Sequence, residues 1–264
     1  MKCFSFDLLA WSAWAPGLET REAWSEWALT PYSPTGAERP SIANVPAALR
    51  RRCSQHDRMV LEVGTNCAAE AIPGSGGQVP PAVVLGSRHG EAQVTRVLLD
   101  LLAEGEPLSP MRFSLSVHNA SSGLLSIATG NKGVFRSISA SIDSLGAAWI
   151  EALSLLVDHS SVLLIVAEEE PPADHHPYLD EQTAAFALAV LLGRGEGCQL
   201  ELAPETAPLR SLLEVQSKSA EQPSLESRPL PHALQLAAWL ARGEIGEFEM
   251  SSLNLNWRLA KNGR

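Results

Sequence analysis

Apolar residues along the chain follow two patterns, helical spacing in some segments and short strand-like runs in others. The strand-like segments are residues 82–87, 134–139 and 161–167. The segments with helical spacing are residues 46–71, 91–104, 119–128 and 143–157. Pro46 suits the first turn of its helix, Asp143 suits an N-cap, and Gly130 suits a helix end. This alternation predicts an α/β fold in which helices cover both faces of a central sheet.

Further elements are expected at both ends of this block. Trp11 and Trp14, like Trp24 and Trp27, are three residues apart, which predicts that each pair lies on one side of a helical turn. Proline and glycine predict a loop at residues 28–45 and a turn at residues 74–77. The remaining expected elements are a strand at 113–117, a hairpin formed by 186–192 and 199–202 around Gly193, Gly195 and Gly197, a helix at 232–241 and a strand at 253–259.

The domain organisation is expected to be simple. No internal repeat is present, and 264 residues suffice for one domain with a full apolar core. Residues 204–231 are rich in proline, serine and glutamate, which predicts a flexible loop. We therefore expect one domain over residues 1–264, interrupted by this loop.

Charge and cysteine content narrow the functional classes. With 20 basic and 30 acidic residues the net charge is −10, and only residues 50–52 form a basic run, so a nucleic-acid partner is not expected. No apolar run approaches the roughly 20 residues that span a bilayer. The four cysteines lack metal-site or disulfide spacing, which favours the reducing cytoplasm.

Candidate chemistry is sparse in the sequence. His175 and His176 lie among acidic residues and prolines, where a solvated loop is expected in place of a metal site, and no cofactor is predicted. The serines of residues 137–144 lie at a strand-to-helix turn, but glycine does not flank them as it does in a nucleophile elbow. His118 stands at the junction of an expected strand and helix.

Residues 82–169 resemble the N-terminal half of a β-ketoacyl synthase, a member of the thiolase-like superfamily. VVLGSRHGE at 83–91 is similar to the glycine-rich strand and turn of the synthases, and LSP at 108–110 is similar to their ISP. NASSGLLSIATGNKG at 119–133 matches their N-x-x-A-G-H-L-x-I-x-x-G-x-x-G segment at Asn119, Gly123, Ile127, Gly130 and Gly133. VLLIVAEEE at 162–170 matches their V-x-x-x-G-G-A-E strand. The resemblance implies a thiolase-like layered α/β fold, truncated to roughly the N-terminal half of a ketosynthase.

The same resemblance implies that the chain is not itself a condensing enzyme. SISASIDSLGAAWIEAL at 137–153 stands in the place of the synthase strand-turn-helix, and the register puts Ile142 where the catalytic cysteine is found. The N-terminus, SRHGE and FSLSVHNASSG are more similar to the short chain-length-factor-like proteins of aryl polyene pathways. Such a subunit pairs with an active β-ketoacyl synthase, shapes an acyl tunnel at the interface, and meets an acyl carrier protein through the complex.

The same resemblance supplies the candidate residues of the site. His118 and Asn119 are expected near the acyl pocket of the partner, and Ile142 is expected to supply apolar volume to the tunnel. Ser121 and Ser122 are expected to be small neighbours that permit close helix packing. Two alternatives stay open: an acyltransferase or hydrolase that uses a serine of residues 137–144 with His118 as base, and a free-standing acyl-binding scaffold.

Overall fold

The computed structural model of the chain describes residues 2–71, 79–204, 224, 227–243, 246–251 and 255–261. The described strands are β1 (Lys2–Trp14), β2 (Ala82–Gly86), β3 (Phe135–Ile138), β4 (Ser161–Glu168), β5 (Phe186–Pro204), β6 (Glu247–Ser251) and β7 (Leu255–Lys261). The described helices are α1 (Arg21–Trp27), α2 (Ala47–Arg50), α3 (Gln55–Ala71), α4 (Ala92–Ala103), α5 (Pro110–Leu115), α6 (Ala120–Thr129), α7 (Ser144–Leu155), α9 (His232–Arg242) and the 3-10 helix η1 (Ala173–Tyr178). None of these helices is long and apolar enough to cross a membrane.

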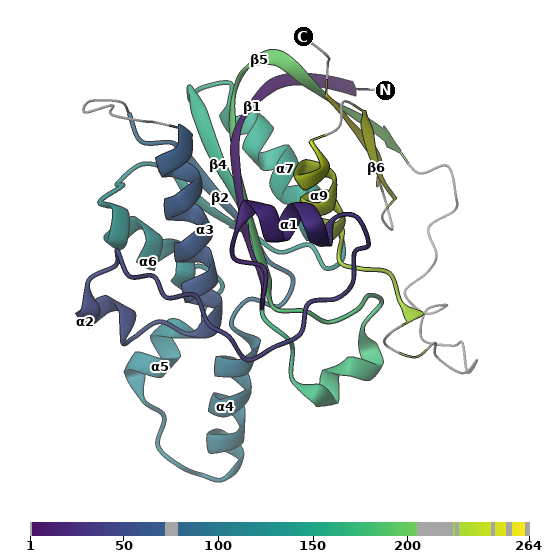
Figure 1. The fold of residues 1–264 in the computed structure, drawn as a ribbon. Coiled ribbons are helices and arrows are strands. Elements are labelled where there is room, and N and C mark those ends of the chain that lie inside the picture. Colours follow the sequence, from purple (N-terminus) through teal and green to yellow (C-terminus); the bar gives the residue numbers. More distant parts are fainter. Residues whose placement is uncertain are drawn as a thin grey trace.

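The strands form one seven-stranded mixed sheet with the order β3-β2-β4-β5-β7-β6, and β1 also pairs with β5. β2 runs parallel to β3 and β4, whereas β5 is antiparallel to β1, β4 and β7. Figure 1 shows α3 and α6 on one face of the sheet and α1, α7 and α9 on the other. The predicted α/β fold with helices on both faces is confirmed.

Two apolar cores lie on the two faces of this sheet. Successive residues of a strand point to opposite faces. Val83 of β2 accordingly packs with the buried residues of α3 and α6, and the next residue, Val84, packs with those of α7 and α9. Because β2 and β4 are covered on both faces, they consist of nearly continuous apolar runs.

The N-terminal tryptophan prediction is half right. Trp24 and Trp27 are both buried in α1, as expected. Trp11 and Trp14 lie in β1, which pairs with β5 over most of its length, so the helical prediction for this pair is wrong. Residues three apart in a strand face opposite sides of the sheet, and Trp11 and Trp14 therefore belong to different cores.

The helix expected over residues 46–71 is interrupted. α2 ends at Arg50, and α3 begins only at Gln55. The cause is a capping interaction: the Ser54 N–H donates to Asp57 Oδ2 at 2.9 Å, and the Asp57 N–H donates to Ser54 Oγ at 2.9 Å. These two bonds start a new helix at a point where the apolar periodicity alone predicts that the first helix continues.

The strand expected at residues 113–117 is also wrong, because these residues follow a helix start. Ser109 caps α5 by accepting from the Arg112 N–H at 3.4 Å, and Pro110 occupies the first turn. The cap and the proline outweigh the strand propensity of the short apolar run that follows.

The expected hairpin of residues 186–202 is instead the single strand β5, with its glycines inside the strand. The pairing with β1 shifts between Phe6 and Asp7, so Phe6 pairs with Cys198 and Asp7 with Gly193. Asp7 Oδ1 accepts from the Gly197 N–H at 2.8 Å, and a Cβ at Gly195 would lie 2.0 Å from Asp7 Oδ2. The glycines thus make room for Asp7 in an irregular strand pair.

The other expected elements near the C-terminus are partly described. α9 confirms the helix at 232–241, and β7 confirms a last strand, although residues 252–254 lie outside the described part. The turn at 74–77 and nearly all of the loop at 204–231 also lie outside it. The flexible loop therefore stays a prediction.

A pair of glycine substitutions tests the packing of α7 on the sheet. A Cβ at Gly86 would lie 2.9 Å from Ala148 Cβ and 3.3 Å from Ser144 O, whereas a Cβ at Gly123 in α6 would meet nothing within 4 Å. We expect Gly86→Ala to lower the free energy of unfolding by about 1–3 kcal/mol. Gly123→Ala should raise it by about 0.5–1 kcal/mol. Denaturant unfolding measures both, and equal effects would contradict the packing described.

Candidate functional site

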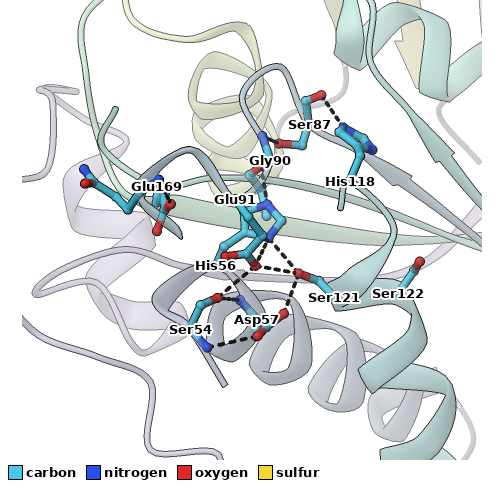
Figure 2. Close-up of polar contacts among 12 residues, drawn as sticks. Ser54, His56, Asp57, Ser87, Gly90, Glu91, His118, Ser121, Ser122 and Glu169 are labelled. Carbon is cyan, nitrogen blue, oxygen red and sulfur yellow. Dashed lines mark hydrogen bonds and ion pairs between the residues drawn. The ribbon is translucent and has the colours of Figure 1, made fainter. Parts of the chain in front are cut away.

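Four segments bring ionisable and hydroxyl side chains together near the carboxyl ends of β2 and β4. They are the start of α3, the turn between β2 and α4, the start of α6 and the end of β4 (Figure 2). We call Ser54, His56, Asp57, Glu91 and Ser121 the polar cluster. His56, Asp57, Glu91 and Ser121 are buried, and this end of an α/β sheet is where ligand sites commonly form.

The contacts of His56 determine its protonation. His56 Nε2 lies 3.2 Å from the carbonyl oxygen of Ala167, which can only accept, so Nε2 carries a hydrogen. His56 Nδ1 lies 2.8 Å from Ser121 Oγ, and Ser121 Oγ donates its own hydrogen to Asp57 Oδ1 at 2.7 Å. Nδ1 must therefore donate as well. The ring is a buried imidazolium, shown at the centre of Figure 2.

Carboxylates compensate this buried positive charge. Glu91 Oε1 lies 3.5 Å from His56 Nδ1 and accepts from Ser54 Oγ at 2.9 Å. Burial alone would lower the pKa of His56, but the hydrogen bond and charge of Glu91 raise it to about 9. Burial would likewise raise the pKa of Glu91, yet His56 holds it below its ordinary value. Burial and the charge of Glu91 raise the pKa of Asp57 to about 6.

Glu168, at the end of β4, fixes the turn between β2 and α4. Its carboxylate accepts from Ser87 Oγ at 3.1 Å, from the His89 N–H at 3.2 Å and from the Arg88 N–H. Burial raises the pKa of Glu168 in spite of these donors. This turn also positions His118, because His118 Nε2 donates to the Ser87 carbonyl oxygen at 2.9 Å.

The turn between β3 and α7 has one residue in the left-handed region, and that residue is Ser141 with φ 54°. Such a sharp strand-to-helix turn is the geometry of a nucleophile elbow. Ser141 is exposed at its tip, and Ile142, one residue later, is half-buried. Asp143 stands at the N-cap position of α7, as expected, although its side chain makes no capping bond.

The predicted site residues lie in two segments, around the start of α6 and in the turn between β3 and α7. His118 is half-buried and Asn119 is exposed, at the start of α6, while Ser121 and Ser122 are buried. Ser121 joins the polar cluster, and Ser122 Oγ lies 3.1 Å from Ser137 Oγ of β3. Ser122 therefore links α6 to the strand that precedes the elbow.

The arrangement gives no ready-made serine nucleophile. Within the described residues, no hydrogen bond joins His118 to a serine of residues 137–144. Ser139 Oγ donates to the Arg88 carbonyl oxygen at 3.2 Å, and Ser144 Oγ donates to the Ser141 carbonyl oxygen at 2.6 Å. The described part of the chain also holds no group of three or more His, Cys, Asp or Glu side chains placed to hold a metal ion.

The charged members of the polar cluster were not predicted from the sequence. His56 and Asp57 fall within the expected helix at 46–71. Glu91 falls at the start of the expected helix at 91–104 and in the strand-and-turn match at 83–91, and neither pattern marks these residues as partners. The one available signal is Ser54 followed three residues later by Asp57, a variant of the capping box that marks a helix start. The meeting of His56 with Ser121 across 65 positions of the chain has no local signal.

Comparison with known proteins identifies the family. Residues 24–258 match the model of the β-ketoacyl synthase N-terminal domain. No curated protein matches the chain. The chain is similar to a chain in the solved complex of the ketosynthase ApeO with its chain length factor ApeC from Xenorhabdus doucetiae, with 31% identity and a TM-score of 0.77 over 97% of this chain and 99% of that one.

More distant structures share the fold. A chain of the ishigamide ketosynthase/chain length factor is 13% identical with a TM-score of 0.70, over 98% of this chain and 100% of that one. A β-ketoacyl synthase from Burkholderia phymatum is 12% identical with a TM-score of 0.61, over 92% of this chain and 71% of that one. These likenesses confirm the ketosynthase-like layered fold.

The pKa of His56 gives a prediction about stability. Because the folded-state pKa of about 9 exceeds the ordinary value of 6.5, the contribution of protonated His56 is fully present below pH 6.5 and is lost as the pH rises through 9. His56→Gln should therefore lower the free energy of unfolding most at the acidic end of this window, by on the order of 3 kcal/mol. The difference in free energy of unfolding between this variant and the wild type should shrink toward the alkaline end of the window.

Denaturant unfolding at a series of pH values measures this difference. His175→Gln, at an exposed position of η1, is the matched control and should leave the stability nearly unchanged. A His56→Gln difference that stays constant across the window would contradict the buried imidazolium.

Proposed function

The chain belongs to the family of the β-ketoacyl synthase N-terminal domain, and we propose that it is a non-catalytic subunit of a condensing enzyme. In this proposal it pairs with an active β-ketoacyl synthase in the cytoplasm. It shapes the acyl tunnel of the complex and so sets the length of a polyene or fatty-acid-type product. The active partner, loaded by an acyl carrier protein, performs the condensation.

The observation that carries the non-catalytic role is the absence of cysteine from the elbow. The only cysteines of the chain are Cys3, Cys53, Cys67 and Cys198, so none lies in residues 137–144. Burial raises the pKa of the Cys53 thiol to about 11 and that of the Cys67 thiol to about 12, so both stay protonated and unreactive. Neither Ser141 nor Ile142 at the elbow can form a thioester.

Apolar surface that the chain leaves uncovered supports the proposed pairing with a partner subunit. α4 is only partly covered by the chain: Leu98 is its one buried residue, whereas Leu99 is 56% and Leu102 is 61% exposed. α5 has no buried residue, and its Phe113 is 60% exposed. Figure 1 shows α4 and α5 projecting away from the sheet. Exposed apolar side chains on neighbouring helices favour a protein interface there.

The sheet also ends in an open edge next to the elbow. β3 pairs only with β2 within the described residues, so its other edge has free backbone donors and acceptors. The strand is short, and the exposed Arg136 lies on it. A partner that covers β3 would also cover the loops that hold His118, Asn119 and Ile142. This placement favours their proposed role at the interface and at the acyl tunnel.

Two observations together support the role of chain length factor. They are the similarity to a chain of a ketosynthase–chain length factor complex and the absence of cysteine from the elbow. The complex that holds the 31% identical chain pairs a ketosynthase with its chain length factor. Another structure of the same fold holds a type II polyketide acyl carrier protein in complex with its ketosynthase. Because this chain lacks the nucleophile, we assign it the role of the chain length factor.

Co-expression with the cognate β-ketoacyl synthase tests the proposal. We expect a one-to-one complex by size-exclusion chromatography with light scattering. The complex should elongate carrier-bound substrate to long products that the synthase alone does not make. A synthase that elongates equally well without this chain would contradict the proposal.

Phe113→Asp tests the α4–α5 face as the partner-binding surface. Since Phe113 is already 60% exposed, the substitution should leave the fold of the chain unchanged. We expect it to weaken the complex by about tenfold or more. The loss of a central interface side chain commonly costs more than about 1 kcal/mol of binding free energy. Val157→Asp, 74% exposed after α7, is the matched control and should not change the affinity measured by calorimetry.

Substitutions at Ile142 test the tunnel role. Ile142→Ala removes side-chain volume and should lengthen the products of the complex, whereas Ile142→Trp should shorten them. Mass spectrometry of released products measures the length distribution. Val157→Ala serves as the control, and an unchanged distribution in both Ile142 variants would remove this residue from the tunnel.

A further inference from the structure

A pocket of ≈ 530 Å³ lies apart from the β3 edge and the elbow, where α3, α4 and α5 meet. Its lining residues are Arg39, Arg52, Cys53, Ser54, Gln55, Gln93, Val94, Val97, Arg112, Leu115 and Glu169. The volume lies within the range of small-molecule sites. The site of the proposed acyl tunnel does not include these residues.

The pocket gathers positive charge in an acidic chain. Arg39, Arg52 and Arg112 all line it, although the net charge of the chain is −10. Some other guanidinium groups of the chain pair with carboxylates, as Arg96 does with Asp100 and Arg258 does with Glu201. Within the described residues, none of the three pocket arginines has a side-chain hydrogen bond or an ion pair. Their charges are therefore available to a bound anion.

Two helix starts also line the pocket, although the Ser54 N–H is already paired with the Asp57 carboxylate. Ser54 and Gln55 stand at the start of the 17-residue helix α3, and Gln93 and Val94 stand in the first turn of α4. Helix N-termini carry partial positive charge. The single carboxylate of the lining is Glu169, which accepts from the Gln93 N–H at 2.9 Å. Burial raises the pKa of Glu169 to about 7, which reduces its repulsion of an anion at neutral pH.

One wall of the pocket is apolar. Val94 and Val97 stand three residues apart on α4, and Leu115 faces them from α5 on the same side as Arg112. Phe113, the residue of the proposed partner-binding face, does not line the pocket. The lining thus offers an occupant both guanidinium groups and aliphatic side chains.

We propose that this pocket binds a small amphipathic organic anion, with a phosphate or carboxylate head on Arg39, Arg52 and Arg112 and a short alkyl or acyl chain against Val94, Val97 and Leu115. Guanidinium groups bind either head group through paired charge-assisted hydrogen bonds. The site is separate from the elbow, and the titrations below use the chain without the partner synthase.

Isothermal titration calorimetry of the full chain tests the proposal with four probes: octyl phosphate, octanoate, inorganic phosphate and octan-1-ol. We expect octyl phosphate or octanoate to bind more tightly than either inorganic phosphate or octanol, and to bind more weakly at high salt. The comparison of octyl phosphate with octanoate identifies the preferred head group. Octanol as the tightest binder would overturn the proposal.

Variants assign the binding to this pocket. The double substitution Arg39→Gln and Arg52→Gln should weaken the tighter amphipathic probe by about tenfold or more, and Arg112→Gln alone should weaken it measurably. Arg51→Gln is the matched control, because Arg51 is exposed, as Arg39, Arg52 and Arg112 are, but does not line the pocket. Val97→Ser should weaken octyl phosphate but leave inorganic phosphate unchanged.

Three further results would overturn the proposal. They are no binding of either amphipathic anion to the wild-type chain, unchanged binding in the arginine variants, and an equal loss in Arg51→Gln. Thermal unfolding of each variant checks the fold. If the double variant does not fold, Arg112→Gln and Val97→Ser decide the question.

Discussion

The buried imidazolium of His56 ties together the segments on which the site depends. Its two ring nitrogens donate to α6 through Ser121 and to β4 through Ala167, and Glu91 brings in the turn after β2. A charge in an apolar interior is costly unless it is paired and hydrogen-bonded. The carboxylates of Asp57 and Glu91 meet that requirement, so the starts of α3, α4 and α6 are held in one arrangement. The loop that presents His118 and Asn119 is built on this arrangement.

The two sides of the domain differ in how completely they are packed. Both faces of β2 and β4 are fully covered by the chain itself, whereas α4 and α5 leave large apolar side chains exposed and β3 leaves an open strand edge. A domain with a complete core has no folding reason for such a surface. The proposed pairing with an active synthase gives this surface a function and places the elbow beside the partner. The pocket lined by Arg39, Arg52 and Arg112 lies where α3, α4 and α5 meet and offers a second binding surface, partly charged and partly apolar.

Sequence patterns predicted the parts of the fold that local periodicity and caps control. The strands β2 and β4, the helices α6 and α7 and the layered α/β class followed from uninterrupted apolar runs, helical spacing and the glycine that ends α6. Errors arose where tertiary contacts decide: β1 and β5 pair over a long irregular ladder around Asp7, and Ser54 interrupts an apolar period. The polar cluster could not be predicted, because His56, Glu91 and Ser121 are distant in the chain and become partners only on folding. The exposure of Leu102 was equally hidden, since an amphipathic face looks the same whether the chain or a partner covers it.

Intact mass spectrometry of the complex between this chain and its cognate synthase, after incubation with an acyl-loaded carrier protein, tests the non-catalytic role most directly. The account predicts an acyl adduct on the synthase and none on this chain, because the elbow at Ser141 and Ile142 has no cysteine. An acyl adduct on this chain, lost on Ser141→Ala substitution, would show instead that the elbow is a working nucleophile and would contradict the account.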